Sequence, residues 1–263
     1  MHTTLTVQAI RWAIDKNVHI ISMSWTIHRT QDNDTGFKEL TAAIKEAQDA
    51  KILMFGAASD QGFNSDRKPF PAKASGVICI GAAKWSGHVE EAAERDADYV
   101  FPGGTFMLPQ TQSNRDEQPQ QVSGSSFATA LASGLTALIL YCVEISSLPP
   151  DPPQRSVPEQ PSTPEQQQES VPEQPPMPPP PFKVDGEHRR LLQNHEIIKA
   201  IFSHIAQREG PVSSKYIAAN RVFGRSTWEE KNWVDSQVRK EFYESVEYII
   251  RHVFRYAQGG DMC

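Results

Sequence analysis

Two serines stand at the point where a long helix is expected to begin, and their position allows two kinds of chemistry. Residues 122–142 read VSGSSFATALASGLTALILYC, so Ser125 and Ser126 follow a glycine and precede a run of small and apolar residues. Serine is favoured at a helix start because its hydroxyl accepts a hydrogen bond from an unpaired backbone N–H. The positive end of a helix also stabilises developing negative charge, which suits a nucleophile. Ser126 is therefore either a helix cap or a nucleophile.

The elements that would position Ser126 alternate between helical and extended patterns over residues 1–147. Strands that are apolar on both faces and separated by helices indicate an α/β fold with a parallel sheet between helical layers. A further helix, rich in Ala, Leu and Gly, is expected over residues 125–145. The other expected elements are helices with Val7, Ile10, Trp12, Ala13 and Ile14 on one face and over residues 35–50, and strands over residues 18–25, 51–58 and 76–83.

The composition changes abruptly at residue 148. Fourteen of the 20 prolines lie in residues 148–182, among Gln, Glu and Ser. Such a segment has almost nothing to bury and is expected to be a disordered linker or insertion. Binding of an SH3 or WW domain to it is an alternative, although most proline tracts are spacers.

Residues 183–263 are expected to be helical. A short amphipathic helix is expected within residues 187–206. A longer amphipathic helix is expected over residues 227–257, with Thr227 and Glu230 forming a capping box. Its apolar face is interpreted as docking on the chain's own domain, with binding to a partner protein as the alternative. That face consists of Val234, Val238, Phe242, Val246, Ile249, Ile250 and Val253.

Charge and composition exclude several classes of function. The net charge of −6 gives no electrostatic basis for binding nucleic acid or an anionic membrane. No secretory signal is visible, and no uninterrupted apolar run reaches about 18 residues, which argues against a membrane span. The three cysteines are far apart and fit a reducing, intracellular compartment. No nucleotide-binding glycine motif or metal-ligand cluster occurs, so no cofactor and no metal are expected.

The segment VSGSSFATALASGLTALIL resembles the nucleophile segment of the subtilisin-like serine peptidases, whose pattern is G-T-S-x-A. Four upstream segments resemble that family in the same order: AIRWAIDKNVHIISMSW, KILMFGAASDQG, RKPFPAKASGVICIGAA and YVFPGG. The resemblance covers the C-terminal part of the catalytic domain, over residues 5–146 and 187–224, so residues 183–224 are implied to complete that domain. It implies the subtilisin-like three-layer fold without its N-terminal part and endopeptidase activity on peptide or protein substrates.

The resemblance also assigns site residues. Ser126 matches the nucleophile, and Asp60 stands where the family has the asparagine that stabilises the oxyanion. Ser24, Trp25 and Thr26 match the strand that pairs with the substrate backbone. Gly56, Ala57, Ala58 and Ser59, together with Phe55, match the wall of the side-chain pocket.

The sequence departs from the family in the catalytic Asp and His that accompany the serine. The family's Asp lies in D-[ST]-G and its His in H-G-T-x-x-A, both ahead of the matching region, and no H-G dipeptide occurs in the chain. Asp34 opens a D-T-G, but this follows the substrate-binding strand, where Thr35 is expected to cap a helix. His88 is expected in a surface turn, so a rewired Asp34–His88–Ser126 triad is disfavoured. The chain is thus interpreted as a peptidase piece, inactive alone, whose Asp and His lie upstream. The alternative is an inactive pseudo-peptidase that binds peptides or proteins.

Overall fold

The computed structural model describes residues 3–27, 34–58, 70–84, 88, 97–104, 106–107, 121–146, 190–207 and 215–217. Four parallel strands form the central sheet in the order β1-β2-β3-β4. Their bounds are β1 Ile20–Met23, β2 Leu53–Ala57, β3 Val77–Ala83 and β4 Tyr99–Pro102, and the short β5 Phe106–Met107 and β6 Gln121–Val122 pair antiparallel. The helices are α1 Thr3–Asp15, α2 Asp34–Asp49, α4 Ser125–Ser146 and α6 His195–Gln207. The predicted α/β class with a parallel sheet is confirmed.

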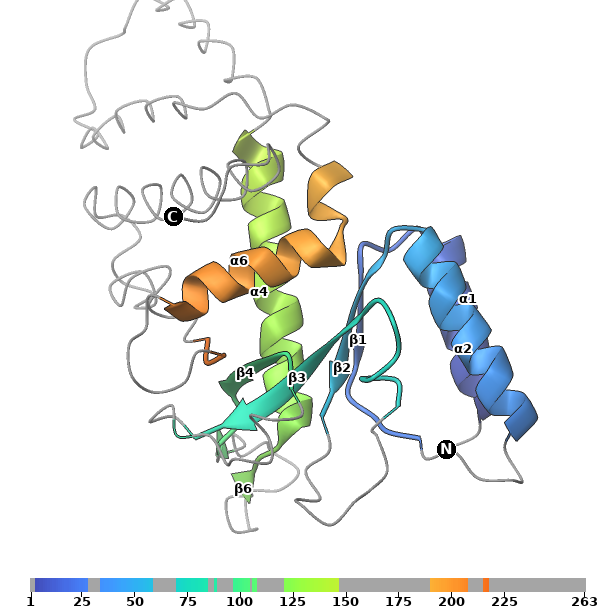
Figure 1. Ribbon diagram of the computed structural model, residues 1–263, viewed down its shortest axis with the longest axis horizontal. Coiled ribbons are helices and arrows are strands. Elements are labelled where there is room, and N and C mark those ends of the chain that lie inside the picture. The colour runs from blue at the N-terminus through green and yellow to red at the C-terminus, as the bar shows by residue number, and fades with distance from the viewer. Residues whose placement is uncertain are drawn as a thin grey trace, which may run out of the picture.

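Helices cover both faces of this sheet (Figure 1). On one face, α1 and α2 pack together and bury Ile10, Leu40 and Ile44 with Met54 of β2 and Val77 of β3. On the other face, α4 crosses all four strands, and α6 lies with it over the same hydrophobic core. The strands are therefore buried on both sides, which explains why their sequences are continuously apolar rather than alternating.

The helix starts and faces differ from the predicted ones in two places. Trp12 was expected on the packed face of its helix, but its side chain is 62% exposed and Lys16 Nζ lies 5.9 Å from the centre of its ring. Thr35 was expected to cap a helix, but α2 already begins at Asp34, whose carboxylate contacts Lys38 Nζ at 2.8 Å. An acidic side chain in the first turn is favoured by the helix dipole.

The strand predicted over residues 18–25 is shorter, since β1 ends at Met23. Ile27 then forms an isolated bridge with Phe70, which precedes the cis peptide bond to Pro71.

An ion pair joins α1 to α2. Two nitrogens of the Arg11 guanidinium, Nε and Nη2, donate to the carboxylate of Glu46, each at 3.0 Å. This contact holds the pKa of Glu46 below its ordinary value.

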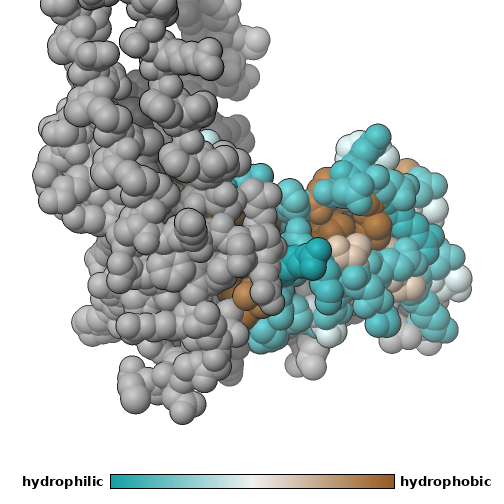
Figure 2. Space-filling view, turned by 90° about the horizontal axis from the view of Figure 1, so that it is seen from above, coloured by the Kyte–Doolittle hydropathy of each residue, from teal (hydrophilic) through white to brown (hydrophobic). Residues whose placement is uncertain are grey.

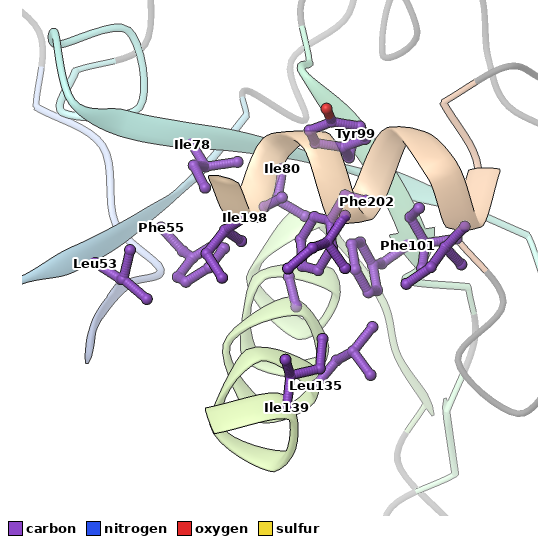
Figure 3. Close-up of a cluster of buried hydrophobic side chains, with 14 of the residues drawn as sticks. Leu53, Phe55, Ile78, Ile80, Tyr99, Phe101, Leu135, Ile139, Ile198 and Phe202 are labelled. Atoms are coloured by element: carbon purple, nitrogen blue, oxygen red, sulfur yellow. The ribbon is translucent and has the colours of Figure 1, made fainter. Parts of the chain in front are cut away.

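Residues that follow the proline-rich stretch in the sequence belong to the hydrophobic core between the sheet and α4. Phe202 of α6 packs its ring against Tyr99, Phe101 and Phe55, with ring centres 5.4, 5.3 and 6.3 Å apart (Figure 3). The Tyr99 hydroxyl also lies 2.7 Å from Ser203 Oγ. Tyr216 bridges Val100 in the parallel direction, next to β4. Residues of α6 and Ile217 therefore share one core with β2, β3, β4 and α4.

One face of the molecule is coloured by hydropathy in Figure 2. Figure 2 shows a hydrophobic patch within a hydrophilic surface, on the side of the molecule where α1 and α2 lie. The predicted proline-rich linker over residues 148–182 and the predicted amphipathic helix over residues 227–257 lie outside the described residues.

Candidate active site

The first turn of α4 meets the carboxyl ends of the parallel strands. Ser24 follows β1, Ala58 follows β2 and Gly103 follows β4, so all three lie at the same edge of the sheet. The amino end of α4 lies at this edge (Figure 1). In open α/β sheets, functional sites form at this edge because loops and helix starts converge there.

Ser126 is tied to Ser24 by two hydrogen bonds that run in opposite directions. The Ser126 hydroxyl donates to the Ser24 carbonyl at 3.2 Å, and the Ser24 hydroxyl donates to the Ser126 carbonyl at 3.1 Å. Ser126 is half-buried and Ser24 is exposed, so the Ser126 hydroxyl lies close to solvent rather than in the core. The sequence prediction of a serine in the first turn of a core helix agrees with this placement.

Ser125 fastens the same turn to β2. Its hydroxyl, 2% exposed, donates to the Ala58 carbonyl at 2.6 Å. This bond ties the residue that follows β2 to the first turn of α4. The Ser125 hydroxyl therefore donates to a carbonyl at the end of β2, whereas the Ser126 hydroxyl donates to the carbonyl of the exposed Ser24.

Two glycines allow the approach of the helix to β4. The Gly124 N–H donates to the Gly103 carbonyl at 2.8 Å, and the Gly103 N–H donates to the Ala83 carbonyl at 2.8 Å. A Cβ on Gly103 would lie 2.5 Å from Ala82 Cβ and 2.8 Å from the Gly124 carbonyl oxygen. Gly124 has φ of 135°, a conformation that favours glycine. Sequence reasoning did not single out Gly103, although the G-G dipeptide at residues 103–104 could have pointed to it.

The three predicted substrate-strand residues lie directly after β1. Trp25 and Thr26 are half-buried, and Trp25 packs against the cluster formed by α1, α2 and β1. Directly after this segment, the Ile27 N–H donates to the Phe70 carbonyl at 2.8 Å. Only Ser24 of the three makes a described side-chain contact with the first turn of α4.

The predicted pocket-wall residues follow the end of β2. Gly56, Ala57 and Ala58 are buried, and a Cβ on Gly56 would lie 2.6 Å from the Ala72 Cα. The Phe55 ring points into the core toward Phe202 and does not face the sheet edge (Figure 3). Ser59 and Asp60 lie outside the described residues.

The two residues of the disfavoured triad have structural roles. Asp34 belongs to the α1 and α2 layer, across the sheet from α4, and its carboxylate contacts Lys38. The His88 carbonyl accepts a hydrogen bond from the Lys84 N–H at 3.0 Å. The Ser126 hydroxyl donates to the Ser24 carbonyl and not to either of these residues.

The arrangement can present a hydroxyl but does not by itself activate one. The acceptor of the Ser126 hydroxyl is a backbone carbonyl, which does not take up a proton near neutral pH. Within the described ranges, no group of three His, Cys, Asp or Glu side chains could hold a metal ion.

A pocket of about 90 Å³ lies at the other end of α4, so it is not part of this site. It is lined by His19, Leu140, Val143, Glu144, Leu192 and Gln193.

Comparisons with known proteins agree with this geometry. Residues 1–150 match the subtilase family, peptidase S8. The chain is 36% identical over 145 residues to the subtilisin-like protease het-Q2 of Podospora anserina, covering 51% of this chain and 37% of the relative. It is 31% identical over 138 residues to an intracellular serine protease of Paenibacillus polymyxa and 29% identical over 132 residues to a thermostable alkaline protease of Halalkalibacterium halodurans. These matches cover 51% and 50% of this chain and 39% and 34% of the relatives.

Solved structures share the fold. The protease domain of PatA, in a mutant form, aligns with a TM-score of 0.50 and 16% identity over 98% of this chain and 66% of that chain. A lanthipeptide protease aligns with a TM-score of 0.51 and 13% identity over 82% of this chain and 64% of that chain. Compared with the three protease relatives named above, the matched part of this chain spans little more than a third of their length.

Proposed function

Because this chain belongs to the subtilase family, we propose that it carries the nucleophile part of a serine-type endopeptidase and that Ser126 is the nucleophile. One observation carries the proposal. The Ser126 hydroxyl lies in the first turn of a core helix, at the carboxyl edge of a parallel sheet, 3.2 Å from the Ser24 carbonyl oxygen. Ser126 is half-buried, so part of this residue is accessible from solvent.

In the proposed reaction, Ser126 Oγ attacks the scissile carbonyl and its proton passes to a base. The oxyanion that forms is stabilised by the Ser126 backbone N–H at the positive end of α4. Asp60 stands where the family has an amide donor. An ionised carboxylate only accepts hydrogen bonds, and the loss of one oxyanion donor costs about 3–4 kcal/mol, or roughly 10²–10³ in rate. Asp60 therefore lowers the activity unless it is protonated or acts through a water molecule.

The substrate is proposed to be an extended peptide that lies along residues 24–26 as an added strand. Its side chain would be received next to Gly56, Ala57, Ala58 and Ser59. The buried positions of Gly56, Ala57 and Ala58 support a wall made of backbone and small side chains. Trp25, which is half-buried against the α1 and α2 layer, would narrow the cleft beside this wall.

The base is proposed to lie outside these 263 residues. The sequence lacks an H-G-T motif, and the Ser126 hydroxyl donates to the backbone carbonyl of Ser24 rather than to a base. A serine hydroxyl without a positioned base is a poor nucleophile near neutral pH. We therefore expect the 263-residue chain alone to be inactive.

A fluorophosphonate probe, which reacts with activated serines, tests this proposal. We expect the 263-residue chain to remain unlabelled at neutral pH, like its Ser126→Ala variant. A longer product of the same gene that carries in-frame D-[ST]-G and H-G-T motifs should be labelled, with the label at Ser126. Labelling of the 263-residue chain at Ser126 would refute the claim that it lacks a base. Failure of the longer chain to label would refute the peptidase itself.

A second function, a pseudo-peptidase that binds peptides without cleaving them, is favoured by Asp60 and by the missing H-G motif. If no upstream motifs exist in the gene, titration calorimetry with extended peptides should detect binding, and Ser24→Pro should weaken it because the residue after β1 would lose its backbone donor.

A further inference from the structure

The part of the chain that follows residue 189 returns to the core through contacts of its own. We call residues 190–207 and 215–217 the clip. The Phe202 ring of the clip lies between the sheet and α4, against aromatic rings of β2 and β4 (Figure 3). The large apolar side chains that the clip buries in this core are Leu192, Ile198, Ile201, Phe202, Ile205 and Ile217.

Hydrogen bonds also fix the position of the clip. The Tyr99 hydroxyl of β4 lies 2.7 Å from Ser203 Oγ. Beside β4, the Val100 N–H donates to the Lys215 carbonyl at 2.9 Å, and the Ile217 N–H donates to the Val100 carbonyl at 2.8 Å. Hydrogen bonds are directional. These contacts therefore specify one placement of the clip on the sheet.

The clip and the Ser126 hydroxyl lie toward opposite ends of the strand order. The clip bridges Val100 of β4, whereas the Ser126 hydroxyl donates to Ser24, which follows β1. In the sheet, β1 and β4 are the first and the last of the four strands. The clip can therefore be altered without changing a residue of the Ser24–Ser126 contact.

The chain leaves α4 and reaches the clip at nearly the same place. Val143 and Glu144 of α4 and Leu192 and Gln193 of the clip line one pocket of about 90 Å³. Neighbouring helices are commonly joined by about 2–8 residues. Here 43 residues, 147–189, separate α4 from the clip, and they lie outside the described part of the chain. Closing this gap does not require a connection of such length.

The clip covers part of the apolar surface of α4. Residues 125–144 are long and apolar enough to cross a membrane by length and composition, in contrast to the sequence expectation, yet half of this window is buried within the protein. Leu135 and Ile139 of α4 belong to the same core as Phe202 of the clip. Loss of the clip would expose apolar surface of α4 and of the sheet to water, which is unfavourable.

We propose that the face formed by the sheet and α4 binds the clip through these contacts alone, so that the protein stays assembled as two polypeptides after the chain is cut between α4 and the clip. In the uncut chain the connection acts as a tether, and a flexible tether raises the local concentration of its partner to the order of mM. Proteolytic processing of the connection then leaves Ser126 and Ser24 in place. This proposal does not depend on peptidase activity.

The full 263-residue chain tests the proposal once it carries the recognition sequence of a sequence-specific protease between Gln167 and Gln168. After cleavage, we expect the two pieces to elute together in size-exclusion chromatography at about 10 μM. Hydrogen exchange of the α4 amides of residues 128–142 should remain within about twofold of the uncut chain, because the clip still covers the helix.

Variants at Phe202 identify the contact that holds the pieces together. In the cut protein, Phe202→Ala should weaken the association by roughly a hundredfold or more. The milder Phe202→Leu should weaken it by roughly tenfold, and it decides the test if Phe202→Ala does not fold. The matched control is Glu196→Ala, at an exposed position of α6, which should elute like the wild type.

Three outcomes would overturn the proposal. The first is a wild-type protein whose pieces separate or precipitate on cleavage. The second is co-elution that the Phe202 variants leave unchanged, because another surface would then hold the pieces together. The third is faster exchange of the α4 amides in cut pieces that still co-elute, because the clip would then have left the core.

Discussion

The hydroxyl of Ser126 donates to the Ser24 carbonyl at 3.2 Å, and the hydroxyl of Ser24 donates back to the Ser126 carbonyl at 3.1 Å. This reciprocal pair joins the end of β1 to the first turn of α4 across 102 positions of the sequence. It places a half-buried hydroxyl at the edge of the sheet with a carbonyl, and not a base, as its acceptor. The position of the proposed nucleophile is therefore built into the fold, whereas its activation is not.

Ser125 is predicted to stabilise the site through its buried hydroxyl. Ser125→Ala leaves the Ala58 carbonyl without this donor, and we expect a loss of about 1–2 kcal/mol in the free energy of unfolding, measured with urea. Ser125→Thr keeps a hydroxyl at the same position and should lose much less. Equal stability of the Ala variant and the wild type would contradict the role assigned to this bond.

Gly103 is predicted to be required for the approach of α4 to β4. In Gly103→Ala the new methyl would overlap Ala82 Cβ and the Gly124 carbonyl oxygen, so we expect a destabilisation of about 1–3 kcal/mol in urea unfolding. Adding Ala82→Gly removes the nearest clash and should recover part of that loss. A Gly103→Ala chain as stable as the wild type would show that the helix is not held this closely.

Phe202 is predicted to make residues 190–207 part of one cooperative unit with the sheet. Its side chain is completely buried between β2, β3, β4 and α4, so Phe202→Ala should cost about 3–5 kcal/mol. The control is Leu5→Ala, because Leu5 is 64% exposed and its removal should be nearly neutral. Unfolding should remain a single transition by fluorescence and circular dichroism. Two separate transitions in the wild type would indicate two domains instead.

Cys142 is predicted to make the protein less stable in alkali. Burial raises the pKa of its thiol to about 11, from an ordinary value near 9. The unfolded chain thus loses this proton at lower pH than the folded chain does, so the thiol's contribution is complete below about pH 9 and is lost as pH rises toward 11. The loss is on the order of 2 kcal/mol. The pH dependence of urea unfolding in Cys142→Ala should lack this component, and identical slopes for the two chains would contradict it.

Much of the fold could be predicted because burial on both faces leaves a clear pattern. Residues 51–58 and 76–83 are continuously apolar, and they form β2 and β3 within one or two residues of the predicted ends. Trp12 was misplaced because hydrophobicity alone does not say on which side of a helix a large ring lies. The exposure of Leu131 and Tyr141 on α4 could not be predicted, because a helix that is apolar all round looks like a fully buried one.

The site could be predicted only in part. Ser126 was found because its neighbours form a local motif that resembles a known family. The partners of the two serines, Ser24 and Ala58, are 102 and 67 positions away, and only the parallel order of the strands brings them together. No local pattern specifies such contacts.

The proximity of Ser126 to Asp60 is the most direct test of the site, and it can be measured with cysteine pairs in a Cys263→Ser background and a short bifunctional thiol reagent. Ser24→Cys with Ser126→Cys should cross-link as a positive control, and Asp49→Cys with Ser126→Cys should not, because Asp49 ends α2. We expect Asp60→Cys with Ser126→Cys to cross-link as efficiently as the positive control. If the positive control cross-links and the pair at positions 60 and 126 does not, the oxyanion position is not beside Ser126 and the proposed active site is wrong.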